Sequence, residues 1–261
     1  MPSAPAPATA TAPAPATLGD RVIGLFTTTG TVTRIEPIAA NMRLIRVESD
    51  EIARLAWTPG QHVRVHVGAR SDRHGWLRPR DALRTYSVWN HDGDGLELCV
   101  LDLCSLDHGT GGPGARWARA LRTGHPVTFG RPEGSFTLRD APYHVFAGEE
   151  TAAVAFGAML RALPAGAPAY GVIEVDGPGD RLPLAHDLHW EYRDGRPAAA
   201  SETLVEAVHR LELPPGPGVA YLAGEARTIA MLRRHLIAER GWPRQAIRTK
   251  PFWAPGRCGL D

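Results

Sequence analysis

Short runs in which apolar and polar residues alternate occupy the chain from Gly30 to about Arg139. An apolar residue at every second position is typical of a strand with one buried face. Turn-forming residues separate the runs, which cover residues 31–35, 42–47 and 62–67, with turns at 59–60, 91–95 and 132–134. This spacing predicts an antiparallel β-barrel.

After Pro142 the pattern changes to apolar strands that alternate with longer amphipathic segments. The expected strands cover residues 143–147, 171–175 and 219–223, and the expected helices cover 151–163, 201–211 and 226–240. Such alternation predicts a parallel, doubly wound sheet. Because ligands of these sheets bind at the carboxyl ends of the strands, residues 148–151 and 224–226 are candidate site segments.

The two patterns together predict an α+β two-domain protein, with an N-terminal antiparallel β-barrel and a C-terminal α/β doubly wound parallel sheet. We expect the barrel domain at residues 20–140 and the α/β domain at 141–261. Residues 1–19 are rich in Ala and Pro, without a basic start or an apolar core. This composition predicts a disordered leader rather than a signal peptide.

The composition is that of a globular protein, with 43% hydrophobic residues, 22% charged residues and a formal net charge of +1. It gives no reason to expect a nucleic acid or a membrane surface as partner. No run approaches the ~18 apolar residues of a membrane span. The three cysteines, at 99, 104 and 258, contain no CxxC pair. Their odd number indicates reduced thiols and a cytoplasmic protein, which we expect to be a monomer.

Two segments carry the most specific chemistry. Residues 84–87 read Arg-Thr-Tyr-Ser on an expected strand, where Arg84 and Tyr86 share one face. Residues 108–113 form a His- and Gly-rich turn that opens a short expected helix at 115–121. A guanidinium and helix-terminal amides hold phosphate, and an aromatic ring and a hydroxyl suit an isoalloxazine. The combination favours a flavin nucleotide over a barrel-core tyrosine beside a solvated arginine.

Other interpretations of these and neighbouring residues are weaker. Residues 109–114 match G-x-G-x-x-G, with Glu133 downstream, but they follow a meander of strands rather than opening a βαβ unit. The histidine pairs 62/66 and 186/189 lack a third ligand of suitable type. We therefore expect neither a Rossmann loop at 109–114 nor a metal site.

The chain resembles the siderophore-interacting proteins, the FAD-dependent ferric-siderophore reductases of the ferredoxin-reductase superfamily, from about Gly30 to Arg257. The order and spacing of several motifs carry this resemblance: residues 84–88, 108–113, 117–118, 132–136, 147–152, 163–166, 173–175, 223–225, 233–236 and 239–241. The resemblance implies a flavin-binding barrel, an α/β domain like those that bind NAD(P)H, and reduction of a ferric siderophore. NAD(P)H or a ferredoxin would be the electron donor.

The resemblance also implies roles for single residues. Arg84 would bind a flavin phosphate, Tyr86 would pack on the isoalloxazine and ribityl chain, and Ser87 would reach toward N5. The remaining residues implied in FAD binding are Thr85, Val88, His108, Gly109, Gly112, Pro113, Trp117, Glu150 and Thr151, and the residues implied in catalysis are Tyr86, Ser87 and Thr151. As cations that would meet an anionic chelate, we name Arg73, Arg78, Arg248 and Lys250.

The chain departs from the family pattern around the presumed cofactor and substrate sites. Trp89 stands where the family has Arg, Ala115 where it has Ser, and Glu149 where it has Asp. Because Trp89, Val154 and Phe252 replace more polar or stiffer residues, an alternative is a biosynthetic enzyme acting on a hydrophobic metabolite, with or without flavin. A third hypothesis is a non-catalytic carrier of flavin or chelate, since fold alone does not settle function.

Overall fold

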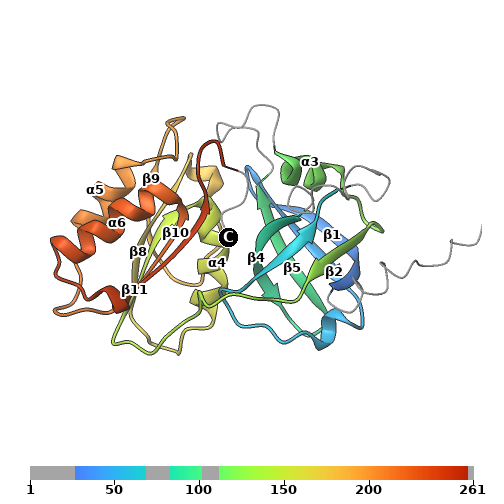
Figure 1. Ribbon diagram of the computed structural model, residues 1–261, viewed down its shortest axis with the longest axis horizontal. Coiled ribbons are helices and arrows are strands. Elements are labelled where there is room, and N and C mark those ends of the chain that lie inside the picture. The colour runs from blue at the N-terminus through green and yellow to red at the C-terminus, as the bar shows by residue number, and fades with distance from the viewer. Residues whose placement is uncertain (1–26, 69–82, 102–111, 258–261) are drawn as a thin grey trace, which may run out of the picture.

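The computed structural model describes residues 27–68, 83–101 and 112–257. They form two units that lie side by side, a barrel and a sheet covered by helices (Figure 1). The elements of the barrel unit are β1 (Thr27–Ala39), β2 (Met42–Glu48), η1 (Ile52–Arg54), β3 (His62–His66), β4 (Leu83–His91), β5 (Gly95–Leu101), α3 (Pro113–Ala120) and β6 (Pro126–Gly130).

The barrel is closed, with its strands in the order β1-β2-β5-β4-β3-β6 and every pair antiparallel. Alternate residues point inward, so that apolar side chains such as Ile45, Val65, Leu98 and Phe129 fill its interior. The predicted turns bend through glycines with positive φ, at residues 60, 93 and 134. The alternation in the sequence therefore specifies the barrel.

The second unit is a five-stranded sheet in the order β11-β10-β7-β8-β9, with all pairs parallel. Helix α4 covers the face of the sheet that is turned toward the barrel, and α5 and α6 cover the opposite face (Figure 1). The elements are β7 (His144–Glu149), α4 (Glu150–Arg161), β8 (Ala169–Val175), η3 (Pro178–Asp180), β9 (His189–Tyr192), α5 (Glu202–Arg210), β10 (Val219–Glu225), α6 (Ala226–Ala238), η4 (Arg244–Ala246) and β11 (Ile247–Trp253).

The two units share a hydrophobic core, because α4 packs between the sheet and strand β4. Trp89 of β4 is buried against Gly157 of α4, where a Cβ atom would lie 2.2 Å from a ring carbon of Trp89. The guanidinium of Arg161 lies 4.2 Å from the centroid of the same ring and donates to the Trp89 carbonyl. The barrel residues Met42 and Leu44 belong to this cluster too. The interface thus holds the edge of the barrel against the sheet.

The structure confirms the predicted fold class, a barrel followed by a doubly wound parallel sheet. The predicted helices are present, with α3 beginning two residues earlier than expected, at Pro113. Two edge strands, β9 and β11, were not predicted. The expected leader at 1–19 lies outside the described residues, and the domain boundaries stay a prediction. No helix in the described ranges is both long and apolar enough to span a membrane.

Candidate cofactor site

Strand β4 and helix α3 bring the first candidate residues together on the barrel. A Cβ atom on Gly114 would lie 2.5 Å from the Tyr86 hydroxyl and 3.4 Å from Cγ of Arg84, so both side chains lie beneath the start of α3. The Trp117 ring packs beside Tyr86, with 5.7 Å between centroids and 30° between planes. Burial raises the pKa of the Tyr86 hydroxyl well above its usual range. The predicted sharing of one strand face by Arg84 and Tyr86 is confirmed.

The N-terminus of α3 offers backbone donors beside this strand. The first N–H groups of a helix have no intrahelical acceptor and carry the positive end of its dipole. The N-cap of α3 is Gly112, and within the described residues no side chain caps this end. A Cβ atom on Gly112 would meet no described atom within 4 Å. Among the described residues, nothing therefore occupies this end of α3, whose free amides suit an anion.

These residues fit the phosphate part of a flavin nucleotide. Cγ of Arg84 lies beneath the first turn of α3, and the Arg84 guanidinium donates to the Leu83 carbonyl at 2.6 Å. Together they combine a fixed cation with helix-terminal amides, which is the usual chemistry of phosphate binding. His108 and Gly109, expected to embrace the same nucleotide, lie outside the described residues, as do Arg73 and Arg78.

The other β4 candidates differ in exposure. Thr85 is exposed and Ser87 is half-buried, so either hydroxyl can meet a ligand. Ser87 lies on the same strand face as Trp89 by the two-residue repeat, which is the face turned toward α4. Val88 is fully buried in the barrel interior, and its backbone N–H donates to the Gln61 carbonyl. The Val88 side chain is therefore a core group.

Glu149 ends strand β7 and caps helix α4 with its own carboxylate. Its oxygens accept hydrogen bonds from the backbone N–H and the hydroxyl of Thr151, at 2.7 and 2.5 Å, and from the indole N–H of Trp253, at 2.9 Å. Burial, with the nearby Glu150 carboxylate adding to it, raises the pKa of Glu149 to about 7. Gly224 has a φ of 117°, and a Cβ there would lie 2.5 Å from the Glu149 carboxylate. Only glycine leaves room for this carboxylate.

Glu150 forms a buried ion pair with Arg193. Both carboxylate oxygens of Glu150 accept from the Arg193 guanidinium at 2.6 Å, a bidentate arrangement. Although burial opposes its charge, this pairing raises the pKa of Arg193. The buried Glu174 carboxylate lies 3.8 Å from Arg193 and accepts from the Ser201 hydroxyl at 2.5 Å. Because the Glu150 oxygens are already engaged, its role in the structure is to hold the strand edge.

The cations expected to meet substrate lie together on β11. Arg248 and Lys250 are two residues apart and pair with Tyr221 and Ala223 of β10, whose side chains belong to the core cluster on the barrel side of the sheet. Both cations are half-buried. Arg248 donates to the Ser135 carbonyl at 2.8 Å, in the segment that leaves the barrel. Both candidates therefore lie on the face where the two units meet.

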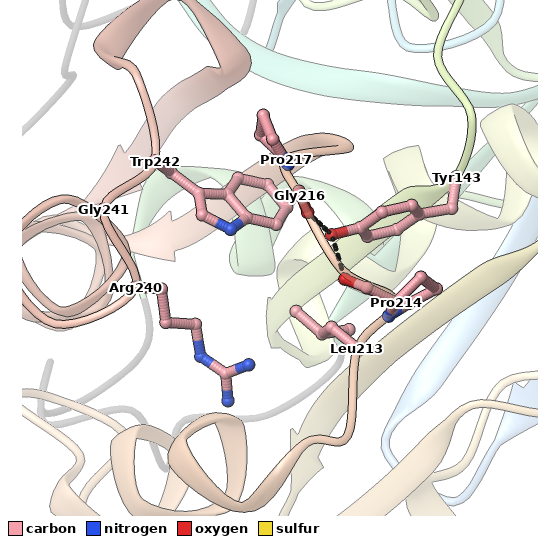
Figure 2. A pocket seen from close by; sticks show the side chains of 8 residues that line it. All are labelled: Tyr143, Leu213, Pro214, Gly216, Pro217, Arg240, Gly241 and Trp242. Carbon is pink, nitrogen blue, oxygen red and sulfur yellow. Dashed lines mark hydrogen bonds between the residues drawn. The ribbon is translucent and has the colours of Figure 1, made fainter.

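A cavity of about 430 Å³ lies at the opposite, amino-terminal edge of the sheet. Figure 2 shows Tyr143 donating to two carbonyls of the loop before β10, those of Gly216 and Pro214, at 2.5 and 3.3 Å. Arg240 on the other side of the cavity donates to the last carbonyls of α5. These contacts tie loops together, so the cavity is separate from the candidate site.

His209, His235 and Glu239 gather on the outer face of α5 and α6, with ligand atoms within 4.8 Å of one another. Nε of Arg240 donates to Nε2 of His235 at 3.0 Å, so that Nδ1 carries the proton and donates to Glu239 at 3.0 Å. The two imidazole rings also stack, with centroids 3.6 Å apart. A metal ion needs a free nitrogen lone pair in each ring plane, which this arrangement withholds. We interpret the cluster as helix packing.

Sequence reasoning missed part of the strand edge. Arg193 was not singled out, because its partner Glu150 is 43 residues away along the chain. Trp253 was not named as a candidate either, although its indole N–H donates to Glu149. Glu225, named only within a candidate strand-end segment, caps α6. A carboxylate directly after an apolar strand and before a helix is the pattern that could have marked Glu149 and Glu225 as caps.

Comparisons with known proteins match both units. The model of the siderophore-interacting FAD-binding domain matches residues 31–136, and that of the siderophore-interacting protein matches residues 141–256. An uncharacterized protein of Mycobacterium tuberculosis is 32% identical over 192 residues, covering 68% of this chain and 67% of that protein. The ferric vibriobactin reductase ViuB of Vibrio cholerae is 30% identical over 189 residues, covering 70% and 68%.

Among solved structures, the siderophore utilization protein from T. fusca has a TM-score of 0.74 at 23% identity and covers 90% of this chain and 95% of its own. Phthalate dioxygenase reductase has a TM-score of 0.64 at 16% identity, with 88% and 70% covered. At these identities the likeness shows the fold, that of the ferredoxin-reductase type.

Proposed function

Since the chain belongs to the siderophore-interacting protein family, we propose that it is an FAD-dependent reductase of ferric siderophores. The observation that carries the proposal is the N-terminus of α3, which no described side chain caps and which lies above Arg84 and Tyr86, within the part that matches the family's FAD-binding domain. The similarity to a ferric vibriobactin reductase supports the choice of reaction. The odd number of cysteines supports a cytoplasmic location.

Different residues of this chain would bind FAD and orient it. Arg84 and the first amides of α3 would hold the FAD phosphates, and Trp117 would keep Tyr86 in place. Ser87 and Thr151 would offer hydroxyls to the flavin ring system where the two units meet. When bound, FAD would supply two-electron uptake from a hydride donor and one-electron transfer to each of two ferric ions.

The proposed substrate is an anionic ferric chelate with hard oxygen ligands. Each iron(III) accepts one electron and becomes iron(II), which such ligands hold less tightly, so no covalent bond of the chelator breaks. One hydride equivalent thus reduces two chelates and releases one proton. Arg248 and Lys250, on the sheet face turned toward the barrel, would attract the negative complex. NAD(P)H or a ferredoxin would be the source of electrons.

The structure gives little support to the alternative of an enzyme for a hydrophobic metabolite. Trp89 and Val154, two of the residues that suggested it, are buried in the core that joins the two units. Phe252 packs against the same core. The Trp89 and Val154 side chains therefore fill space within the protein rather than lining an apolar substrate site, whereas Phe252 is half-buried.

The proposal is tested by a single-turnover experiment. Protein loaded with FAD is photoreduced without oxygen and mixed with ferric citrate or ferric enterobactin, both anionic, in the presence of a ferrous trap. We expect the flavin to reoxidise and two equivalents of iron(II) to appear for each flavin. Protein that takes up no FAD, or reduced flavin that persists with both chelates, would contradict the proposal.

A further inference from the structure

The strand order creates one crevice at the carboxyl edge of the sheet. Along the sequence β7 comes first, β8 and β9 follow on one side of it in the sheet, and β10 and β11 follow on the other side. The order therefore reverses between β7 and β10. In doubly wound sheets a dinucleotide binds at this point, with its pyrophosphate against a helix N-terminus. In this chain the two strands end in Glu149 and Glu225.

Both helix ends at this crevice already hold a carboxylate of the chain. Glu149 accepts from the first turn of α4 and from Trp253, and lies over Gly224 of the neighbouring strand. Glu225 accepts from the backbone N–H groups of Arg227 and Thr228 at 2.9 and 2.8 Å, within the first turn of α6. Each carboxylate is at most 2% exposed.

Glu225 is also tied to the rest of the edge. It accepts from the Thr228 hydroxyl and from the Ala200 backbone N–H, both at 3.0 Å. Burial alone would raise the pKa of Glu225, but these hydrogen bonds from the backbone and from Thr228 lower it below its usual range. An ionised carboxylate is thus built into the place of a phosphate.

Two further buried carboxyl groups lie close to the two caps. Glu150 and Glu174 are buried beside the crevice, and the Arg193 guanidinium lies against both. Two of the buried carboxyl groups at this edge, those of Glu150 and Glu174, therefore lie against one buried guanidinium. A pyrophosphate placed here would lose its amide donors to the chain's own caps, and it would meet the ionised carboxylate of Glu225, whose pKa is lowered.

Helix α3 on the barrel shows the contrast. Its N-cap is a glycine, and no described side chain accepts from its first turn. The helices α4, α5 and α6 are capped by Glu149, Ser201 and Glu225. Within the described ranges, the N-terminus of α3 thus lacks a side-chain cap, whereas the helix N-termini of the second unit have one.

We propose that Glu149 and Glu225 exclude the pyrophosphate of a pyridine dinucleotide from the switch point of the sheet, so that such a donor is recognised by its nicotinamide half alone. This inference rests on the proposed function, because it concerns the donor of the same flavin. A reductant without an adenylate half would serve as well as NADH. The carboxylates are specificity-determining groups, and they need not touch the flavin.

The first test uses the wild-type protein loaded with FAD. ADP-ribose, the part of NADH without nicotinamide, is titrated by calorimetry, and we expect a Kd weaker than about 1 mM. NADH, NADPH and reduced nicotinamide mononucleotide are then compared by anaerobic stopped flow, with second-order rate constants expected within about threefold of one another. Each charge-assisted hydrogen bond to a pyrophosphate would otherwise favour the dinucleotides about tenfold or more. The inference would be overturned if NADH reduced the flavin saturably and about tenfold or more faster than reduced nicotinamide mononucleotide. Tight binding of ADP-ribose would overturn it too.

The second test removes a carboxylate while keeping a helix cap. Glu225→Ser retains a good N-cap residue, and we expect it to bind ADP-ribose at least about tenfold more tightly than the wild type. Glu202→Ser, an exposed glutamate in the first turn of α5, is the matched control and should bind it no better. No gain in folded Glu225→Ser, judged by circular dichroism, would overturn the role of Glu225.

The two proposals fail in different ways. Photoreduced protein that does not pass electrons to a ferric chelate would refute the proposed function, whatever ADP-ribose does. Protein that reduces the chelate after photoreduction, yet binds ADP-ribose tightly, would refute only the exclusion of the pyrophosphate.

Discussion

The most informative single substitution is Glu149→Gln, which replaces a buried ionisable group by a neutral one of the same shape. Burial raises the pKa of Glu149 from 4.5 to about 7. The fold therefore favours the protonated form. Its contribution to stability is fully present below pH 4.5 and is lost as the pH rises through 7.

The size of this effect follows from the two pKa values. Between pH 5 and pH 8 the contribution of Glu149 to the free energy of unfolding falls by roughly 2–3 kcal/mol. Glu149→Gln does not titrate, so it lacks this decrease. The amide also turns one N–H toward the Thr151 N–H, which otherwise donates to Glu149, and this cost is the same at both pH values. Comparing the pH dependence of the two proteins therefore isolates the ionisation.

The assay is urea unfolding at pH 5 and pH 8, followed by circular dichroism at equal flavin loading. The wild type should lose roughly 2–3 kcal/mol more than Glu149→Gln between these pH values. Glu225→Gln is the control: because the pKa of Glu225 is lowered, its pH dependence should match the wild type within about 0.3 kcal/mol. A difference under about 0.5 kcal/mol for Glu149→Gln would refute the reasoning.

Two further predictions concern the interface and the strand edge. Gly157→Ala should destabilise the protein by about 1–3 kcal/mol, as measured by chemical unfolding, because its methyl group overlaps the Trp89 ring. Gly130→Ala is the control and should have a smaller effect, because no described atom lies within 4 Å of its Cβ. Equal effects of the two substitutions would contradict the packing of α4 against Trp89. Arg193→Met should lower the free energy of unfolding by about 3–5 kcal/mol, because it leaves Glu150 buried without its partner. Adding Glu150→Gln to this variant should restore part of the lost stability. Additive losses in the double variant would contradict the ion pair.

Much of the fold could be predicted because each unit follows one simple periodicity. The two-residue repeat placed Arg84 and Tyr86 on one face of β4, and both lie beneath α3. The edge strands were harder to predict. Strand β9 has four residues, and β11 contains Pro251, which lacks the N–H that a central strand donates.

The electrostatic part of the strand edge could not be predicted in the same way. Residues joined by a strand or a helix repeat are close in sequence, whereas Glu149 meets Trp253 across 104 positions. Only the order of the parallel strands brings them together. The sequence predicted that the segment around Glu149 belongs to a site. That the Glu149 carboxylate lies at a helix N-terminus, where a phosphate would otherwise bind, could be recognised only from the structure.

The central claim is that an FAD phosphate binds at the open end of α3 beside Arg84, and affinities for FAD and riboflavin test it most directly. Both ligands are titrated into flavin-free protein by fluorescence quenching, using the wild type, Arg84→Ala and Arg54→Ala, an exposed arginine of η1. We expect the wild type and Arg54→Ala to prefer FAD at least about hundredfold, and Arg84→Ala to lose at least about tenfold of that preference. Equal affinity of the wild type for both ligands, or an FAD preference unchanged by Arg84→Ala, would contradict the account.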